Sequence, residues 1–266
     1  MIDNRKAVKK RILLGRICMT LALGLLIMNF SGCAYRVLFW KRNMWQDMQG
    51  VVTMVEPADL KLYREFLPQQ FELPDQPMVG IFVMDYLDTE PWMITPTKFL
   101  RPYLEASILL RCNYEDRTGW YSLTMPVTDE GARIGGRRLG FPKYIADSIT
   151  LYQTETGWLG KVVHQGTCPI YLEFTPAPLS GMGKLNPVHE AFMQGEGDAE
   201  LKGPFILLVP PEIGPRVKVI PISPPPRAIM ETGQVKIKLA APWNGLVPDG
   251  TLSPGLFERF TVGAGK

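Results

Sequence analysis

The stretch EASILLRCNY (residues 105–114), followed by EDRT (115–118) and GWYSLTMP (119–126), indicates the fold class of this chain. The two outer segments are short and mostly apolar, and the tetrapeptide between them has the composition of a turn, so the stretch predicts a β-hairpin. Similar short apolar or alternating segments, separated by turn residues, recur along the chain. They predict further strands at residues 51–55, 78–84, 144–153, 157–165, 170–175, 205–209, 217–222 and 235–239.

Roughly ten short strands without alternating helices predict a mainly β fold, a single antiparallel β-barrel or sandwich with a few short helices. The high contents of glycine (25) and proline (24) agree with many turns. One helix is expected after Pro57, with Asp59 as its N-cap and Pro68 at its end. Closed sheets of this kind often enclose a cavity for a small molecule.

The N-terminal segment has the composition of a targeting sequence. A basic stretch at residues 9–11 precedes an apolar run at 17–30, and FSGC at residues 30–33 resembles a bacterial lipobox. The resemblance implies a signal peptide at residues 1–32 and lipidation of Cys33. The alternative is an uncleaved membrane anchor, although the apolar run of 14 residues is shorter than the ~20 residues that cross a bilayer.

A lipidated Cys33 would attach the protein to a membrane through its acyl chains. We therefore expect a lipidated tether at residues 33–50 and one folded domain at residues 51–266. Ala34 follows the cysteine, and in the lipoproteins that this segment resembles an aspartate there favours the inner membrane. The expected location is the periplasmic face of the bacterial outer membrane, with inner-membrane anchoring as the alternative.

Several classes of function receive no support from the composition. Residues 1–33 hold six basic residues against one aspartate, so the remainder of the chain is slightly acidic and offers no basic surface for nucleic acid. His164 and His189 are the only histidines, and no Cys-x-x-Cys spacing occurs, so we expect no metal and no other cofactor. Cys112 and Cys168 could pair in an oxidising compartment or stay as buried thiols, and we favour the thiols.

The densest chemical signal is GGRRLGFPK at residues 135–143. Three glycines and a proline impose special backbone geometry, and Arg137, Arg138 and Lys143 place three cations close together. A charged surface loop is the simplest interpretation. Two observations argue against it, because the segment lies between apolar strands and its Leu-Gly-Phe-Pro part is too apolar for a freely solvated loop.

LGFPK at residues 139–143, followed by Asp147-Ser148, resembles the signature of the acetoacetate decarboxylase family. In that family two lysines precede the motif; the first forms a Schiff base with the substrate and the second lowers its pKa. The matching positions here are Arg137 and Arg138. Tyr103-Leu104-Glu105 resembles the family's Tyr-x-Glu motif, which implies that Glu105 is the active-site carboxylate and that Tyr103 contacts the substrate. The family also uses an arginine near its first strand, which has no counterpart here.

The arginines change the expected chemistry. Decarboxylation of a β-keto acid through an imine needs a neutral amine, and acetoacetate decarboxylase is itself the standard example of a lysine activated for this purpose. A guanidinium stays protonated in proteins, so Arg137 cannot take that role. It can instead hold a carboxylate through paired hydrogen bonds. Lys143 is the best alternative lysine for an imine, although the family has a lysine there in addition to its catalytic pair.

Three functions therefore remain open from the sequence. The first is a lipid-anchored, acetoacetate decarboxylase-like protein that binds a small keto or organic acid with Glu105, Tyr103, Arg137 and Arg138, without Schiff-base decarboxylation. The second is an active carbon–carbon lyase that uses Lys143 or another lysine. The third is a structural envelope lipoprotein with a filled barrel and Arg137 exposed to solvent. The expected partners are a small carboxylate, the membrane and a possible second copy of the chain.

Overall fold

A computed structural model describes residues 45–89, 93–95, 98–182, 185–193, 205–209, 217–222 and 227–261. The predicted signal peptide at residues 1–32, the lipidation site Cys33 and the predicted tether as far as residue 44 lie outside the described residues. The first strand begins at Trp45, six residues before the start predicted from the sequence.

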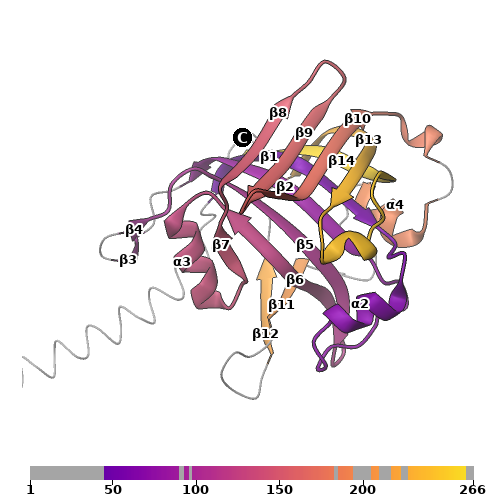
Figure 1. The fold of residues 1–266 in the computed structure, drawn as a ribbon, viewed down its shortest axis with the longest axis horizontal. Helices are drawn as coiled ribbons and strands as arrows, with labels where there is room; N and C mark the ends of the chain where they lie inside the picture. Colours follow the sequence, from indigo (N-terminus) through magenta and orange to yellow (C-terminus); the bar gives the residue numbers. More distant parts are fainter. Residues whose placement is uncertain are drawn as a thin grey trace, which may run out of the picture. The chain divides into compact units, whose positions relative to one another are not determined.

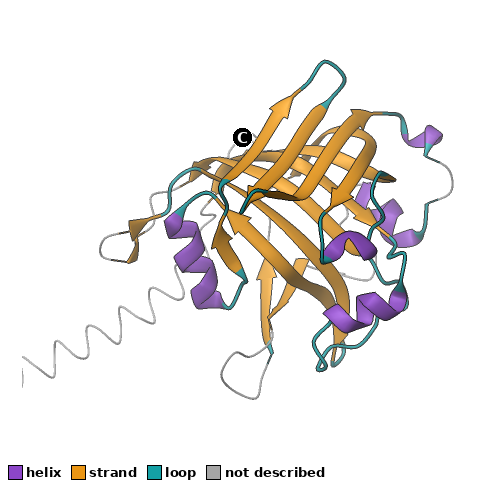
Figure 2. Ribbon diagram, in the orientation of Figure 1, coloured by secondary structure: helices purple, strands orange, loops and turns teal. Residues whose placement is uncertain are grey.

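Strands make up most of the described chain (Figures 1 and 2). They are β1 (Trp45–Val55), β2 (Val79–Thr89), β3 (Met93–Thr95), β4 (Lys98–Phe99), β5 (Tyr103–Tyr114), β6 (Arg117–Val127), β7 (Lys143–Ile145), β8 (Ser148–Gln153), β9 (Trp158–His164), β10 (Thr167–Pro176), β11 (Phe205–Val209), β12 (Lys218–Ile222), β13 (Arg227–Leu239) and β14 (Thr251–Thr261). The helices are α2 (Leu60–Phe66), α3 (Glu130–Leu139), α4 (Pro187–Met193) and the short 3-10 turns η1 (Leu179–Gly181) and η2 (Trp243–Gly245).

One large sheet organises the domain. In the described part of the chain it has twelve strands in the order β12-β11-β6-β5-β2-β1-β14-β13-β10-β9-β8, with β7 paired to β6, and β3 and β4 form a separate pair. Figure 1 shows that the sheet curls strongly, so that β8 at one end contacts β2 and β5. The predicted mainly β class is confirmed. The sheet is a curled half-barrel, and it is mixed because β6 pairs in parallel with β7 and β11.

The β6–α3–β7 segment departs from the all-antiparallel sheet expected from the sequence, because β6 and β7 pair in parallel. A parallel pair cannot be joined by a tight turn and needs a crossover, and α3 supplies it. By contrast, β5 and β6 form the predicted hairpin, with Glu115 in a left-handed conformation (φ 56°) at its turn. The crossover matters for function because it carries the motif that the sequence singled out.

The main hydrophobic core lies on the face that the curl encloses. Its members come from both halves of the sheet and include Val83 of β2, Ile108 of β5, Val162 of β9 and Ile237 of β13, none of them accessible to solvent. Val83 packs so closely against Gly160 that a Cβ on the glycine would lie 2.9 Å from the Cβ of Val83. Strands β2 and β9, which are far apart in the strand order, are therefore in direct contact at this point.

Alternation along β5 separates this core from a second, more polar face. Ala106, Ile108 and Leu110 belong to the main core. Glu105 and Ser107 alternate with them and therefore project from the opposite side of the sheet. The carboxylate that the family resemblance singled out thus faces away from the enclosed core, toward the side on which α3 lies.

Two local predictions can be checked directly. The Asp59 side chain accepts hydrogen bonds from the backbone N–H groups of Lys61 and Leu62, which confirms it as the N-cap of α2. Cys112 is a buried free thiol, as favoured from the sequence, whereas Cys168 is also free but exposed. Among the described helices, none is long and apolar enough to cross a membrane.

Candidate functional site

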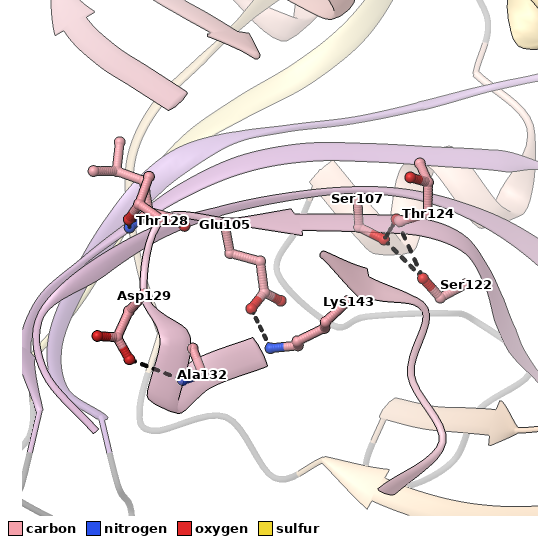
Figure 3. A network of polar contacts seen from close by, with 9 residues as sticks. Glu105, Ser107, Ser122, Thr124, Thr128, Asp129, Ala132 and Lys143 are labelled. Atoms are coloured by element: carbon pink, nitrogen blue, oxygen red, sulfur yellow. Dashed lines mark hydrogen bonds and ion pairs between the residues drawn. The ribbon is translucent and has the colours of Figure 1, made fainter. Parts of the chain in front are cut away.

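Helix α3 contains most of the arginine-glycine motif. Its N-cap is Asp129, whose carboxylate accepts a hydrogen bond of 2.8 Å from the backbone N–H of Ala132 (Figure 3). Its end is fixed by Gly140 in a left-handed conformation (φ 101°), with the N–H groups of Gly140 and Phe141 bonded to the Gly136 carbonyl. This is a Schellman-type helix end, which needs glycine at that position and is commonly followed by proline.

The Leu-Gly-Phe-Pro sequence therefore has a plain structural explanation. Gly140 ends the helix, Phe141 is buried in a hydrophobic cluster with Met125, and Pro142 prevents the helix from continuing. The chain then enters β7 directly at Lys143. The consequence of this tight connection is that the position of Lys143 is set by the helix end.

Lys143 and Glu105 meet across the β5–β6–β7 part of the sheet. Glu105 is opposite Val127 of β6, and Lys143 is opposite Met125 of the same strand. Because residues two apart on a strand share a face, both side chains project from the same side. Lys143 Nζ donates a hydrogen bond to Glu105 Oε2 and forms an ion pair with it (Figure 3).

This ion pair is deeply buried. Lys143 is 7% exposed and Glu105 is 4% exposed, and the neighbouring cluster contains Met84, Val127 and Ala132. The aliphatic part of Lys143 lies against α3, where a Cβ on Gly136 would be 2.3 Å from Cδ and 2.6 Å from Cε. Only glycine at position 136 leaves room for the lysine in this conformation.

Two tyrosines border the ion pair. Tyr86 of β2 and Tyr103 of β5 are cross-strand partners whose rings stack with centroids 4.5 Å apart. The Lys143 ammonium lies 5.7 Å from the centroid of the Tyr103 ring, within the range of a cation–π contact. Burial, followed by the charge of Glu105, raises the pKa of Tyr86 well above its usual value, so its hydroxyl stays protonated.

The two arginines of the motif lie in the last turn of α3 and are exposed. Arg137 Nε donates a hydrogen bond of 2.7 Å to the backbone carbonyl of Lys143. The structure thus brings Glu105, Tyr103 and Lys143 together, and it places Arg137 next to them at the backbone of Lys143. The ion-pair partner of Glu105 is Lys143.

A second polar group lies farther along the same face of β5 and β6. Ser107 Oγ donates to the Thr124 carbonyl at 2.9 Å and is 3.1 Å from Ser122 Oγ (Figure 3). The Thr124 side chain connects to β7 on the opposite face, where Oγ1 donates to the hydroxyl of Tyr144 at 3.4 Å; Tyr144 alternates with Lys143 along β7. These groups satisfy one another and link β5, β6 and β7. Within the described residues no cluster of three His, Cys, Asp or Glu side chains could hold a metal ion.

The comparison with protein families adds to this geometry. The sequence profile described as acetoacetate decarboxylase matches residues 39–192, which is more than half of the chain. The chain belongs to the acetoacetate decarboxylase family. The matched region includes Glu105, Tyr103, α3 and Lys143, so the whole candidate site lies within the family domain. Among curated protein sequences, none matches this chain significantly.

Solved structures of acetoacetate decarboxylase-like proteins share the fold. An acetoacetate decarboxylase from Legionella pneumophila is 16% identical, with a TM-score of 0.55 over 81% of both chains. Another acetoacetate decarboxylase structure is 20% identical, with a TM-score of 0.57 over 82% of this chain and 86% of that one. The enduracididine biosynthesis enzyme MppR, complexed with pyruvate, is 14% identical, with a TM-score of 0.52 over 80% and 85% of the two chains.

Tyr86 is the residue near the site that sequence reasoning missed. It stands in an apolar strand without any motif, and its position beside Tyr103 depends on the β2–β5 register. The close contact between Gly136 and Lys143 could not be predicted from the sequence either, because it depends on how the end of α3 directs the chain into β7. The contact between the buried Lys143 and Glu105, 38 residues apart in sequence, could be recognised only from the structure.

Proposed function

We propose that this acetoacetate decarboxylase-like protein binds a small keto or organic acid beside α3 and β5, without forming a Schiff base. The observation that supports the proposal is the buried Lys143–Glu105 ion pair, with Arg137 held against the carbonyl of Lys143. A buried ammonium is a natural partner for the carboxylate of a ligand, since charge attraction is strong where water is scarce.

Arg137 stands where the family motif has its imine-forming lysine. Its guanidinium cannot lose a proton at ordinary pH and so cannot attack a ketone. Its hydrogen bond to the Lys143 carbonyl gives it a different role, as a fixed positive charge that also orients residue 143. This substitution removes the usual electron sink for decarboxylation and leaves charge recognition intact.

Lys143 is the remaining amine at the site, and its Nζ donates to Glu105 in a buried ion pair. A cation of this kind can hold an anionic ligand, whereas formation of an imine needs a neutral amine. The carboxylate of a ligand can take the place of the Glu105 carboxylate on this cation. The proposed ligand is therefore a small monocarboxylate, whose charge matches the one that it displaces.

Calorimetric titration with pyruvate, acetoacetate and small hydroxy acids tests this function. We expect saturable binding that Lys143→Met abolishes and that Arg137→Ala weakens by about 5- to 10-fold, the size of one partly exposed charge-assisted hydrogen bond. Arg117→Ala is the matched control, because Arg117 is an exposed arginine in the β5–β6 hairpin, far along β5 from Glu105. Absence of binding, or equal binding by Arg137→Ala, contradicts the proposal and favours a purely structural protein.

The buried position of Lys143 also supports a second candidate, a lyase in which this lysine forms the imine. Borohydride treatment in the presence of acetoacetate separates the two functions, because it reduces an imine to a stable adduct. The proposed function requires that the protein mass stay unchanged. An adduct on Lys143, located by mass spectrometry, would assign the protein to Schiff-base enzymes.

We further propose that Cys33 is lipidated and attaches the domain to the periplasmic face of a bacterial membrane, the outer membrane in preference to the inner. The support is the lipobox-like FSGC sequence after a basic and apolar segment. We expect labelled palmitate to be incorporated into the protein and its incorporation to be lost in Cys33→Ala but retained in Cys18→Ala. Equal labelling of the two variants would contradict lipidation at Cys33.

A further inference from the structure

The two ends of the large sheet are strands with very different sequences. In the described part of the chain, β12 and β8 are the terminal strands, and each pairs with a single neighbour. The sequence of β12 includes Lys218 and Pro221, and a lysine or a proline in a terminal strand hinders the addition of another strand. β8 has the sequence SITLYQ, without a charge or a proline. The end of the sheet at β8 therefore lacks the usual protection against further strand pairing.

The charged residue that precedes β8 is turned away from this edge. Asp147 Oδ2 accepts a hydrogen bond of 2.7 Å from the backbone N–H of Gln165, and the N–H of Asp147 donates to the Val163 carbonyl. Both contacts direct Asp147 toward β9 and the turn that follows it. Figure 1 shows that the β8–β9 hairpin projects beyond the neighbouring strands, so a second strand could approach β8 there.

The backbone groups that β8 offers to a further strand follow from its register with β9. The Thr154 N–H donates to the Gly157 carbonyl at 2.7 Å, and these two residues continue the β8–β9 register. Hydrogen-bonded and non-hydrogen-bonded pairs alternate along an antiparallel ladder. Every second residue of β8 before Thr154 therefore bonds to β9. The N–H and C=O groups of Ile149, Leu151 and Gln153 point to the other side, toward the edge.

Thr150 lies in the middle of β8 and has a hydroxyl group without a partner. Its neighbours Ile149 and Leu151 pack against the main core, so Thr150 projects from the opposite face of the sheet. Its Oγ1 is buried and makes no hydrogen bond with any described residue. A buried hydroxyl without a partner costs free energy. A group supplied from outside the chain would remove that cost.

We infer that β8 pairs antiparallel with β8 of a second copy of this chain, around a two-fold axis that passes beside Thr150. An axis perpendicular to the sheet keeps the core faces of the two copies on the same side. It must therefore place one residue opposite its own copy. The inference does not depend on the ligand proposed above, because it uses neither Lys143 nor Glu105.

The register centred on Thr150 uses the groups that the edge provides. Ile149 of each copy exchanges backbone hydrogen bonds with Leu151 of the other, and these are residues whose N–H and C=O groups point to the edge. The two Thr150 residues form a non-hydrogen-bonded pair, in which opposite side chains are closest. Their hydroxyl groups can then bond to each other. The large Tyr152 is opposite the small Ser148 of the second copy.

Self-complementarity favours a second copy over a foreign peptide. Because β8 has no charged residue, two identical strands do not repel each other. The core face of each strand brings apolar side chains, Ile149 and Leu151, to the pair. The outer face brings the hydroxyl that each Thr150 lacks as a partner. A foreign strand would have to supply both features in the same register.

Sedimentation equilibrium of the full chain in a neutral detergent tests the association over a range of concentrations. We expect a monomer–dimer equilibrium. Thr150→Lys places two ammonium groups opposite each other at the axis and should raise the dissociation constant by at least about 10-fold. Thr175→Lys is the matched control, because Thr175 is exposed on the same face of β10, away from the edge, and should leave the dissociation constant unchanged. Circular dichroism confirms that each variant is folded.

Disulfide formation tests the register independently of stability. In a background with Cys168→Ser, which removes the exposed thiol, Thr150→Cys should link two copies under mild oxidation. Residues in a non-hydrogen-bonded pair have Cα atoms about 4.5 Å apart, and a disulfide spans about 4.4–6.8 Å. Tyr152→Cys is the control on the same face. Its two copies would lie about 13 Å apart along the strands, too far for a disulfide.

The outcomes separate pairing at β8 from other association. A dimer that Thr150→Lys weakens, together with a disulfide in Thr150→Cys alone, supports the inference. A monomer at every concentration, or a dimer with an unchanged dissociation constant in Thr150→Lys, would overturn it. Equal linkage of the Thr150→Cys and Tyr152→Cys variants would overturn it as well, because chance collisions give that result.

Discussion

Replacing Lys143 with methionine is expected to lower the free energy of unfolding by about 3–5 kcal/mol, the effect of leaving one member of a buried ion pair without its partner. Glu105 is 4% exposed, so its charge cannot be solvated in place once the ammonium is gone. Methionine keeps the length and apolar character of the lysine stem that packs against Gly136. Urea denaturation of the purified variant and parent proteins measures the difference.

A double variant shows whether the loss comes from the unpaired charge. Lys143→Met combined with Glu105→Leu removes both charges and should recover most of the stability, because buried ion pairs contribute little over apolar residues of similar size. Arg133→Ala is the matched control on the same helix; it breaks the partly exposed Arg133–Glu130 pair and should cost less than about 1 kcal/mol. A double variant no more stable than Lys143→Met would show that the pair itself stabilises the fold.

Gly136→Ala should combine a loss of stability with a loss of ligand binding. The new Cβ would lie 2.3 Å from Lys143 Cδ and 2.9 Å from Cγ, so the lysine stem must move away from the helix. We expect a cost of about 1–3 kcal/mol from this overpacking. Because the ammonium that should hold the ligand's carboxylate moves with the lysine stem, pyruvate binding should also be lost, which calorimetry would detect.

The neighbouring glycine provides the control for this prediction. Gly135 is half-exposed on the same helix, and Gly135→Ala is expected to add up to about 1 kcal/mol of helix propensity without moving Lys143. Because the two substitutions are chemically identical, a difference between them reports only the contact with Lys143. Equal stability and equal binding in both variants would show that the lysine has room to shift.

The fold class was predictable because strand periodicity is a local property. The hairpin at residues 105–126 and the alternating strand at 235–239 could be recognised from their own residues. Helix α3 could not be recognised from its own residues. Gly131, Gly135 and Gly136 are poor helix formers, and they interrupt the apolar periodicity that would indicate a helix. Its existence depends on tertiary contacts, namely the crossover that β7 needs to pair in parallel with β6.

The candidate site was only partly predictable for a related reason. A motif could identify Glu105, Tyr103 and the arginines one by one. Which of them touch is decided by strand register, which pairs Glu105 with Val127 and Lys143 with Met125. The sequence identified Lys143 as a family residue and as the best alternative lysine for an imine, but it did not indicate that Lys143 is the direct partner of Glu105.

The pairing of β1 with β14 has a consequence for how the domain forms. Thr53 on β1 donates its hydroxyl hydrogen bond to the carbonyl of Pro254 on β14, 201 residues away in sequence. β14 also lies between β1 and β13, so the middle of the sheet stays open until the last strand has emerged from the ribosome. Contacts this remote slow folding, because a long segment must be ordered before they can form. Loss of residues 251–261 would expose two unpaired strand edges at once and invite aggregation.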